Sequence, residues 1–152
     1  QILVDKINNA SKFNQGFQTV EATASALVDM KLHLAGDKKI DADAFEKETL
    51  AALGMPSEIV MRHRTPQFGH IFSSDGYSAG YYSYLWSDVI SADAWEAFTE
   101  SPGGAYDKGV AKRFYDHVFS VGNTVDPAES YVKFRGREPK TDALMRSKGL
   151  GK

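Results

Sequence analysis

The sequence predicts an all-α protein. Apolar residues recur at intervals of three and four in several segments, which is the spacing of one face of a helix. Glycine or proline follows most of these segments, as is usual where helices end. No convincing run alternates apolar and polar residues in the way of a half-buried strand, and no internal repeat or interdomain linker is evident. We therefore expect residues 1–152 to form a single helical domain.

The composition narrows the class of protein and its partners. A chain of 152 residues with 42% hydrophobic and 25% charged residues has the make-up of one globular domain. The net charge of −2 lacks a basic excess, so we expect no nucleic-acid partner. Charges interrupt every apolar stretch well before the roughly 20 residues that cross a bilayer, so we expect no membrane partner.

The N-terminus and the cysteine content give two further expectations. The chain begins with Gln1 rather than Met and shows no signal peptide, so we expect it to be a fragment of a longer protein, called the parent below. It contains no cysteine, which excludes disulfides and thiolate metal sites and permits the reducing cytosol. We expect a cytoplasmic protein.

Two helices are predicted in the first third of the chain. Residues 17–34 carry an apolar stripe, and Gly36 follows them. Residues 41–54 begin with Asp41 or Asp43 as a possible N-cap. The apolar face of this second helix consists of Phe45, Leu50 and Leu53.

The middle of the chain predicts a loop between helices. Pro56 begins a segment, 56–62, that is expected to form a short helix. Residues 65–80 have the Pro, Gly and Ser content of a loop. A helix is predicted from Tyr81, and a second one restarts at Ser91 or Asp93.

Two more helices are predicted toward the C-terminus. Residues 108–122 place Val110, Phe114 and Val118 on one stripe and end at a glycine, Gly122. Residues 140–149 form a last short helix that ends at Gly149.

The histidines do not form a recognisable metal site. No two of them have the i, i+4 spacing of a zinc-binding helix, and no close carboxylates complete a ligand set. We expect His33 and His117 at the surface or rim of helices and His63 in a solvated turn. No metal ligand is therefore assigned within this chain.

Aromatic residues concentrate between Phe68 and Phe98, which hold half of all aromatic residues in a fifth of the chain. Core packing accounts for some of them, because aromatic residues at helical spacing usually pack. We assign this packing role to Tyr82, Leu85, Trp86, Trp95 and Phe98.

The remaining rings carry polar groups that core packing does not require. Tyr77 lies in the loop and Tyr84 near the start of the next helix, so both hydroxyls can converge on one point. His70 reaches that point from the other end of the loop. Two phenols and an imidazole around one position can form a cradle for an oxyanion or a carboxylate.

The stretch "FGHIFSSDGYSAGYYSYLWSDVISADAWEAF" closely resembles the Gly/Tyr-rich segment of the M3 family of zinc metallopeptidases, which includes thimet oligopeptidase, oligopeptidase A and peptidyl-dipeptidase. "FNQGFQTVEATASALVDMKLH" is similar to the preceding helix of that family, and "FRGREPKTDALMRSKGL" to its closing motif. The bacterial peptidyl-dipeptidases look nearest. The resemblance implies the C-terminal helical part of an M3 catalytic domain, with a Gly/Tyr-rich loop at about 69–80.

The resemblance also implies roles for individual residues. Tyr84 matches a tyrosine that donates a hydrogen bond to the tetrahedral oxyanion, and Tyr77 and His70 match catalytic residues that assist it. In the substrate-binding set, Tyr81 faces the substrate, and two hinge glycines let the loop close over a peptide. These glycines are Gly76 and Gly80. The stretch between His70 and Tyr77 is one or two residues longer than in some relatives.

The zinc ion that the resemblance implies would be bound in the parent, by an H-E-x-x-H helix and a downstream Glu that precede this segment. We therefore expect the parent to be an enzyme, an oligopeptidase or peptidyl-dipeptidase acting on short peptides, and the fragment alone to be inactive. Its other expected partner is the N-terminal part of its own parent chain. The cluster Arg62, His63 and Arg64 fits either a contact with a substrate carboxylate or a solvated turn.

Two alternatives stay open at this point. The tyrosines could form the contact surface of a non-catalytic peptide- or ligand-binding helical module. They could also only pack within a structural helical domain.

Overall fold

The computed structural model describes residues 1–151. All regular elements in this range are helical, so the all-α prediction is confirmed. The chain divides into two compact units, Gln1–Trp86 and a second unit that starts at Ser87. None of the helices in the described range is long and apolar enough to cross a membrane.

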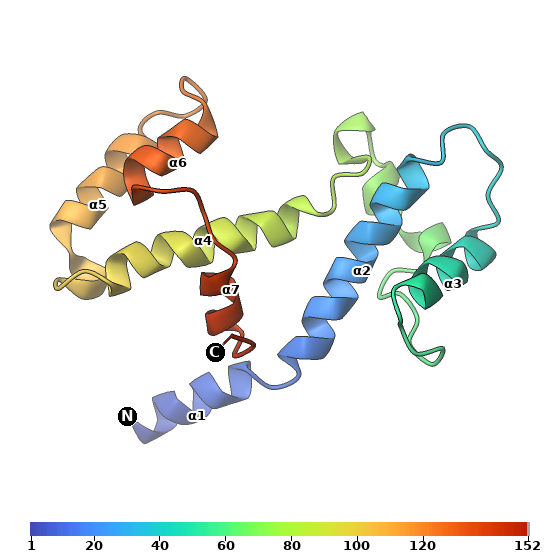
Figure 1. Ribbon diagram of the computed structural model, residues 1–152, viewed down its shortest axis with the longest axis horizontal. Helices are drawn as coiled ribbons and strands as arrows, with labels where there is room; N and C mark the ends of the chain where they lie inside the picture. Colours follow the sequence, from blue (N-terminus) through green and yellow to red (C-terminus); the bar gives the residue numbers. More distant parts are fainter. Residues whose placement is uncertain (152) are drawn as a thin grey trace. The chain divides into compact units, whose positions relative to one another are not determined.

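The first unit contains three α-helices and three 3₁₀ turns. Figure 1 shows α2 and α3 side by side, with the turns that follow α3 beside them. In chain order the elements are α1 (Ile2–Ser11), α2 (Gln15–His33), α3 (Ala42–Ala52), η1 (Thr65–Gln67), η2 (Gly69–Phe72) and η3 (Asp75–Tyr77).

The core of the first unit lies between α2, α3 and the turns. Helix α2 contributes Ala24 and Val28, and α3 contributes Leu50. The chain after α3 adds Met61, Phe68 and Ile71. Of the predicted apolar face of α3, Leu50 lies in this core and Phe45 packs against it, whereas Leu53 is 44% exposed, so that part of the prediction is wrong. Asp41 caps α3 by accepting a hydrogen bond from the backbone N–H of Ala44 at 2.9 Å, which selects it over Asp43.

The expected short helix at 56–62 is wrong. The chain there makes a single turn, closed by a hydrogen bond from the N–H of Ile59 to the carbonyl of Pro56, and then runs on without helix. Met61 is 4% exposed in the core and Arg64 pairs with α3. These tertiary contacts override the local preference for a helix.

Helix α4 (Ser83–Thr99) is continuous, so the predicted restart at Ser91 or Asp93 is also wrong. Asp93 does not cap a helix, because its carboxylate binds side chains from the end of the chain. Tyr81 and Tyr82 precede the helix rather than beginning it.

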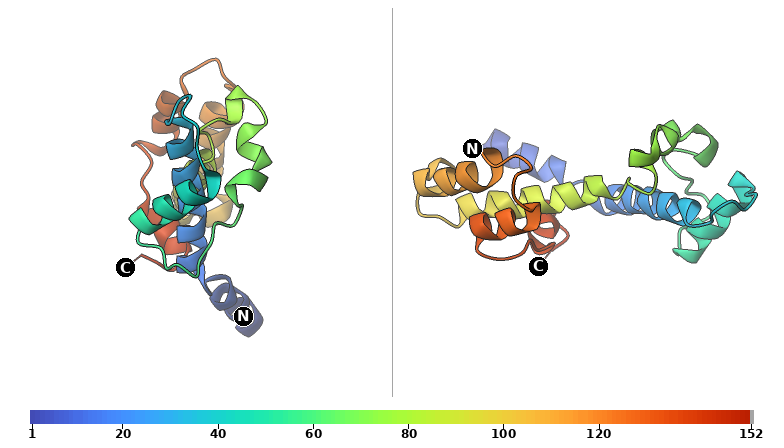
Figure 2. Two further views of the ribbon diagram at one scale, coloured as in Figure 1. Left: turned by 90° about the vertical axis from the view of Figure 1, so that its right-hand side faces the viewer. Right: turned by 90° about the horizontal axis from the view of Figure 1, so that it is seen from above.

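The second unit consists of the helices that pack around the later part of α4. Figures 1 and 2 show α5 and α6 next to each other in this unit. Its further elements are η4 (Gly104–Tyr106), α5 (Lys108–Phe114), the π-helical turn η5 (Tyr115–Phe119), α6 (Pro127–Arg135) and α7 (Asp142–Ser147).

The core of the second unit confirms the predicted stripe of 108–122. Val110 is buried in this core, and Phe114 and Val118 pack against the core. The remaining buried members come from α4 and α6, namely Ala94, Ala97, Tyr131 and Phe134. Helix α6 was not predicted; it begins after Asp126, which caps it, and ends at Gly136, whose φ is +82°.

The expected core packing of several aromatic residues in α4 and just before it is wrong. Trp86 and Trp95 are about half exposed, as is Tyr82, whereas Phe98 packs against the core. The buried residues of the helix are Val89, Asp93, Ala94 and Ala97. Trp95 lies midway in sequence between Asp93 and Ala97, and therefore points away from the side that these two residues bury.

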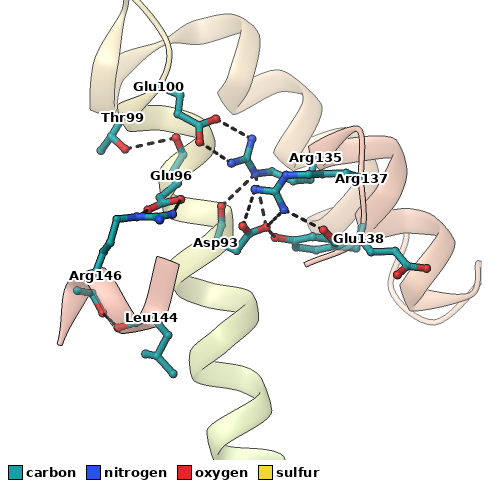
Figure 3. Close-up of polar contacts among 11 residues, drawn as sticks. Asp93, Glu96, Thr99, Glu100, Arg135, Arg137, Glu138, Leu144 and Arg146 are labelled. Atoms are coloured by element: carbon teal, nitrogen blue, oxygen red, sulfur yellow. Dashed lines mark hydrogen bonds and ion pairs between the residues drawn. The ribbon is translucent and has the colours of Figure 1, made fainter. Parts of the chain in front are cut away.

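A polar network ties the closing motif to α4 in the second unit (Figure 3). Asp93 is fully buried and accepts hydrogen bonds from both terminal nitrogens of Arg137, at 2.7 and 3.0 Å. The hydroxyl of Tyr131 donates to the same carboxylate at 2.5 Å. Arg135 donates to the backbone oxygen of Asp93 and binds Glu100 in a bidentate ion pair.

Burial acts to raise the pKa of the Asp93 carboxyl. The hydrogen bonds from Arg137 and Tyr131, with the charges of Arg137 and Arg135, outweigh burial and hold that pKa below its ordinary value. Burial and the hydrogen bond to Asp93 raise the pKa of Tyr131. The network is therefore an ionised carboxylate held by cations and one phenol.

Candidate functional site

The four side chains that the sequence assigned to one site lie together in the first unit. The ring of His70 lies 4.8 Å from that of Tyr77, 5.7 Å from that of Tyr81 and 5.8 Å from that of Tyr84. The rings of Tyr81 and Tyr84 are 5.3 Å apart. We call these four residues the ring cluster.

The polar groups of the ring cluster meet at His70 and Tyr84. The hydroxyl of Tyr84 lies 3.3 Å from Nε2 of His70, within hydrogen-bond distance. Tyr84 is 55% exposed and Tyr77 46% exposed, so both hydroxyl-bearing rings are open to a ligand. The cluster can thus present a phenol whose hydroxyl is held at an imidazole.

The core of the first unit places the two ends of the cluster. Ile71 is fully buried and fixes η2, which carries His70. Phe68 is also buried, and its ring meets that of Tyr81 edge to face at 4.8 Å. Tyr84 stands in the first turn of α4. The apolar residues of the loop therefore hold the polar ones in position.

The segment between Tyr77 and Tyr81 makes a tight turn. Gly80 is closely packed, because a Cβ there would lie 3.3 Å from the carbonyl oxygen of Tyr77 and the neighbouring backbone would have to shift slightly. Gly76 has more space, with Ser74 the nearest neighbour at 3.8 Å. The residue with a positive φ in this turn is Ala79, at 55°, rather than either glycine.

Two residues of α2 contact this turn and were not assigned to the site from the sequence. Asp29 is fully buried and accepts hydrogen bonds from the N–H of Ala79 at 3.2 Å and of Tyr81 at 2.9 Å. Nδ1 of His33 lies 2.8 Å from the Asp29 carboxylate. The sequence contained one indication of this role: Asp29 is a charged residue that directly follows Val28 in the apolar stripe of 17–34.

The basic cluster at 62–64 is mostly engaged within the first unit. Arg64 pairs with Asp43 at 2.7 Å and with the buried Glu46 at 2.6 Å. The ring of His63 stacks on that of Phe68 at 5.0 Å. Arg62 is exposed.

The described residues do not fit a zinc site. Within residues 1–151, no group of three or more His, Asp or Glu side chains is arranged to hold a metal ion. No chemical step is therefore derived through a metal bound by this chain.

The chain is similar to peptidases along nearly its whole length. The model of peptidase family M3 matches residues 1–150. Dipeptidyl carboxypeptidase of Escherichia coli (strain K12) is 36% identical over 151 residues, which are 97% of this chain and 22% of that protein. Oligopeptidase A of the same strain is 34% identical over 151 residues, with the same coverage. Oligopeptidase A of Haemophilus influenzae is 48% identical over 83 residues, 55% of this chain and 12% of that protein.

The chain spans about a fifth of the length of the two Escherichia coli relatives, 22% of each. Their identities of 36% and 34% do not separate a dipeptidyl carboxypeptidase from an oligopeptidase A. The family match over residues 1–150 and the similarity to both relatives establish that the chain belongs to peptidase family M3.

Proposed function

We propose that the parent protein hydrolyses peptide bonds in short peptides and that this chain supplies hydrogen-bond donors to the substrate and the transition state. The observation that carries the proposal is the 3.3 Å contact between the exposed Tyr84 hydroxyl and Nε2 of His70. Membership of peptidase family M3 supports the reaction class.

Each member of the ring cluster has a proposed part. The Tyr84 hydroxyl donates to the oxyanion that forms on the scissile carbonyl, where a well-placed donor is most effective. His70 holds this hydroxyl in place, and Tyr77 donates to the transition state or the substrate backbone. Tyr81 faces the substrate, next to the tight turn at Gly80.

The zinc ion and the general base are proposed to come from other parts of the parent, since residues 1–151 do not form a metal site. The same parts of the parent are the proposed protein partner of this chain. We propose the cytoplasm as the place of action.

Peptide cleavage by the parent and by the 152-residue chain alone tests the proposal. A fluorogenic short peptide should be cleaved by the parent, with loss of cleavage after chelation and recovery with added Zn²⁺. The chain alone should neither cleave the peptide nor retain zinc. A parent that binds the peptide without cleaving it would contradict the proposal and favour a peptide-binding module.

The same assay resolves the cleavage preference. An otherwise identical peptide with an amidated C-terminus removes the carboxylate that release of a C-terminal dipeptide requires. A peptidyl-dipeptidase should lose most of its activity on the amidated peptide, whereas an oligopeptidase that cuts internal bonds should retain it.

A further inference from the structure

Asp29 is a buried carboxylate whose partners come largely from the turn that precedes Tyr84. Burying a charge is unfavourable unless hydrogen bonds or an opposite charge compensate it. For Asp29, which is 0% exposed, two of the compensating donors are backbone N–H groups 50 and 52 residues further along the chain, at Ala79 and Tyr81. The compensation is therefore complete only when this turn is docked on α2.

His33 fixes the orientation of this carboxylate. Its Nδ1 lies 2.8 Å from Oδ1 of Asp29 and 3.0 Å from the Asp29 carbonyl oxygen. The N–H of Ala79 is a third neighbour of Nδ1, at 3.3 Å. The two closer neighbours are both acceptors, so we assign the hydrogen to Nδ1, which then donates to Asp29. The N–H of Ala79 then donates to Oδ1 and the N–H of Tyr81 to Oδ2.

The docked turn determines where the ring cluster stands. Ala79 holds a φ of 55°, which is unfavourable for a residue with a Cβ and persists only where surrounding contacts enforce it. Tyr81 is fixed by its own N–H, and its ring contacts those of His70 and Tyr84. Helix α4 begins at Ser83, directly after the tethered residues.

From these contacts we propose that Asp29, oriented by His33, is the positioning residue of the ring cluster. It touches none of the reacting groups and acts through the backbone of residues 79–81. This inference rests on the proposed function, because it names the residue that sets the geometry of the same site.

The chain offers a matched control for this role. Glu46 is also a buried carboxylate of the first unit, at 2% exposure, and it also binds a backbone N–H of a distant turn, that of Thr65 at 3.0 Å. Its other polar partners are the Thr65 hydroxyl and Arg64, neither of which belongs to the ring cluster. Glu46→Gln thus weakens a similar tether at a place that does not set the positions of the tyrosines.

Kinetics of the parent provide the first test. Asp29→Asn should lower kcat at least about tenfold, because a misplacement of about 1 Å can cost 100-fold, whereas Glu46→Gln should leave kcat of the folded protein within about twofold. In a Tyr84→Phe background, the further effect of Asp29→Asn should shrink to less than about threefold, since residues that act as a unit are not additive. Equal kcat values for the two carboxylate variants, or full additivity with Tyr84→Phe, would overturn the inference.

Amide hydrogen exchange of the parent provides a test that does not depend on activity. Asp29→Asn should increase exchange at Ala79 and Tyr81, and Glu46→Gln should increase it at Thr65 instead. Unchanged exchange at Ala79 and Tyr81 would overturn the tether alone. If the two variants change exchange as expected but the wild-type parent cleaves no peptide, the tether stands and only the proposed function is overturned.

If Asp29→Asn does not fold, His33→Ala provides a second way to test the role of Asp29. Because His33 lies on the Oδ1 side of the carboxylate, exchange should increase more at Ala79 than at Tyr81. An equal increase at both amides, or no increase at either, would contradict the arrangement described here.

Discussion

At the scale of single residues, three buried carboxylates each hold a different segment of the chain in place. Asp29 holds the turn between Tyr77 and Tyr81 of the ring cluster, Glu46 holds the turn at Thr65, and Asp93 holds the closing motif in the second unit. Each accepts donors that are distant in sequence. Burying an unpaired carboxylate is energetically unfavourable, so each of these residues is stable only when the two remote segments that it joins are in contact.

Asp93→Asn should destabilise the second unit by about 2–3 kcal/mol, because it removes the negative charge that offsets the burial of the cations and the phenol bound to it. Arg137 is partly exposed and can turn to water, which limits the loss. Tyr131→Phe removes one donor and should cost only about 1 kcal/mol. Urea unfolding of the chain measures both, and equal losses for the two variants would contradict this assignment.

The lowered pKa of Asp93 predicts the pH at which this contribution disappears. The ordinary value is 3.8 and the folded value is lower, so the folded state binds the proton less readily than the unfolded state. The stabilisation is complete above about pH 5 and is lost as the pH falls through the folded pKa. The difference in unfolding free energy between wild type and Asp93→Asn should therefore shrink below about pH 4. A difference that stays constant between about pH 3 and pH 7 would contradict a lowered pKa of Asp93 in the folded state.

The sequence predicted the ring cluster but not the carboxylate that docks it. His70, Tyr77, Tyr81 and Tyr84 lie within fifteen positions of one another, so a local argument could bring their rings together. The partners of Asp29 are 50 and 52 residues away, and no local pattern connects them.

At the scale of elements, short-range chemistry predicted the helix ends well. Gly36, Gly122 and Gly149 were expected to follow helices, and all three have positive φ values, which glycine adopts without strain. The N-cap of α3 was narrowed to two aspartates, and the structure selects Asp41. Ends are predictable because their contacts span only a few residues.

The cap of α3 gives a prediction at this scale. Asp41→Ala should cost about 1 kcal/mol of stability, because the N–H of Ala44 loses its acceptor. Asp37→Ala removes an exposed aspartate that precedes the helix and serves as the control. Urea unfolding compares them, and an equal effect of both substitutions would show that the loss comes from charge and not from the cap.

The elements that were missed depend on distant contacts. The segment 56–62 was expected to form a helix, but the burial of Met61 and the pairing of Arg64 with Glu46 hold it in a single turn followed by non-helical chain. Helix α4 runs through Ser91 and Asp93 because the Asp93 carboxylate binds Tyr131 and Arg137 rather than capping a new helix. In both cases tertiary contacts decide between local alternatives.

At the scale of the whole molecule, each unit has its own hydrophobic core. The first is built around Val28, Phe68 and Ile71, and the second around Val110 and Phe134. A chain with two compact units need not unfold in a single step. Stability is then a property of each unit.

Core truncations should act on one unit at a time. Ile71→Ala should cost about 2–5 kcal/mol, and Phe134→Ala about 3–5 kcal/mol, because both side chains are almost completely buried. Hydrogen exchange should increase mainly before Ser87 for Ile71→Ala and mainly after Trp86 for Phe134→Ala. Uniform loss of protection in both units by either variant would show instead that they unfold together.

The central claim is that the ring cluster supplies a donor to the transition state of peptide hydrolysis, and the kinetics of Tyr84→Phe in the parent test it most directly. The matched control is Tyr106→Phe, which removes a hydroxyl from a 93% exposed tyrosine of the second unit. For Tyr84→Phe, kcat should fall about 10²–10³-fold with little change in KM, while the control stays near wild type. An effect confined to KM, or an equal effect of the two substitutions, would contradict the claim.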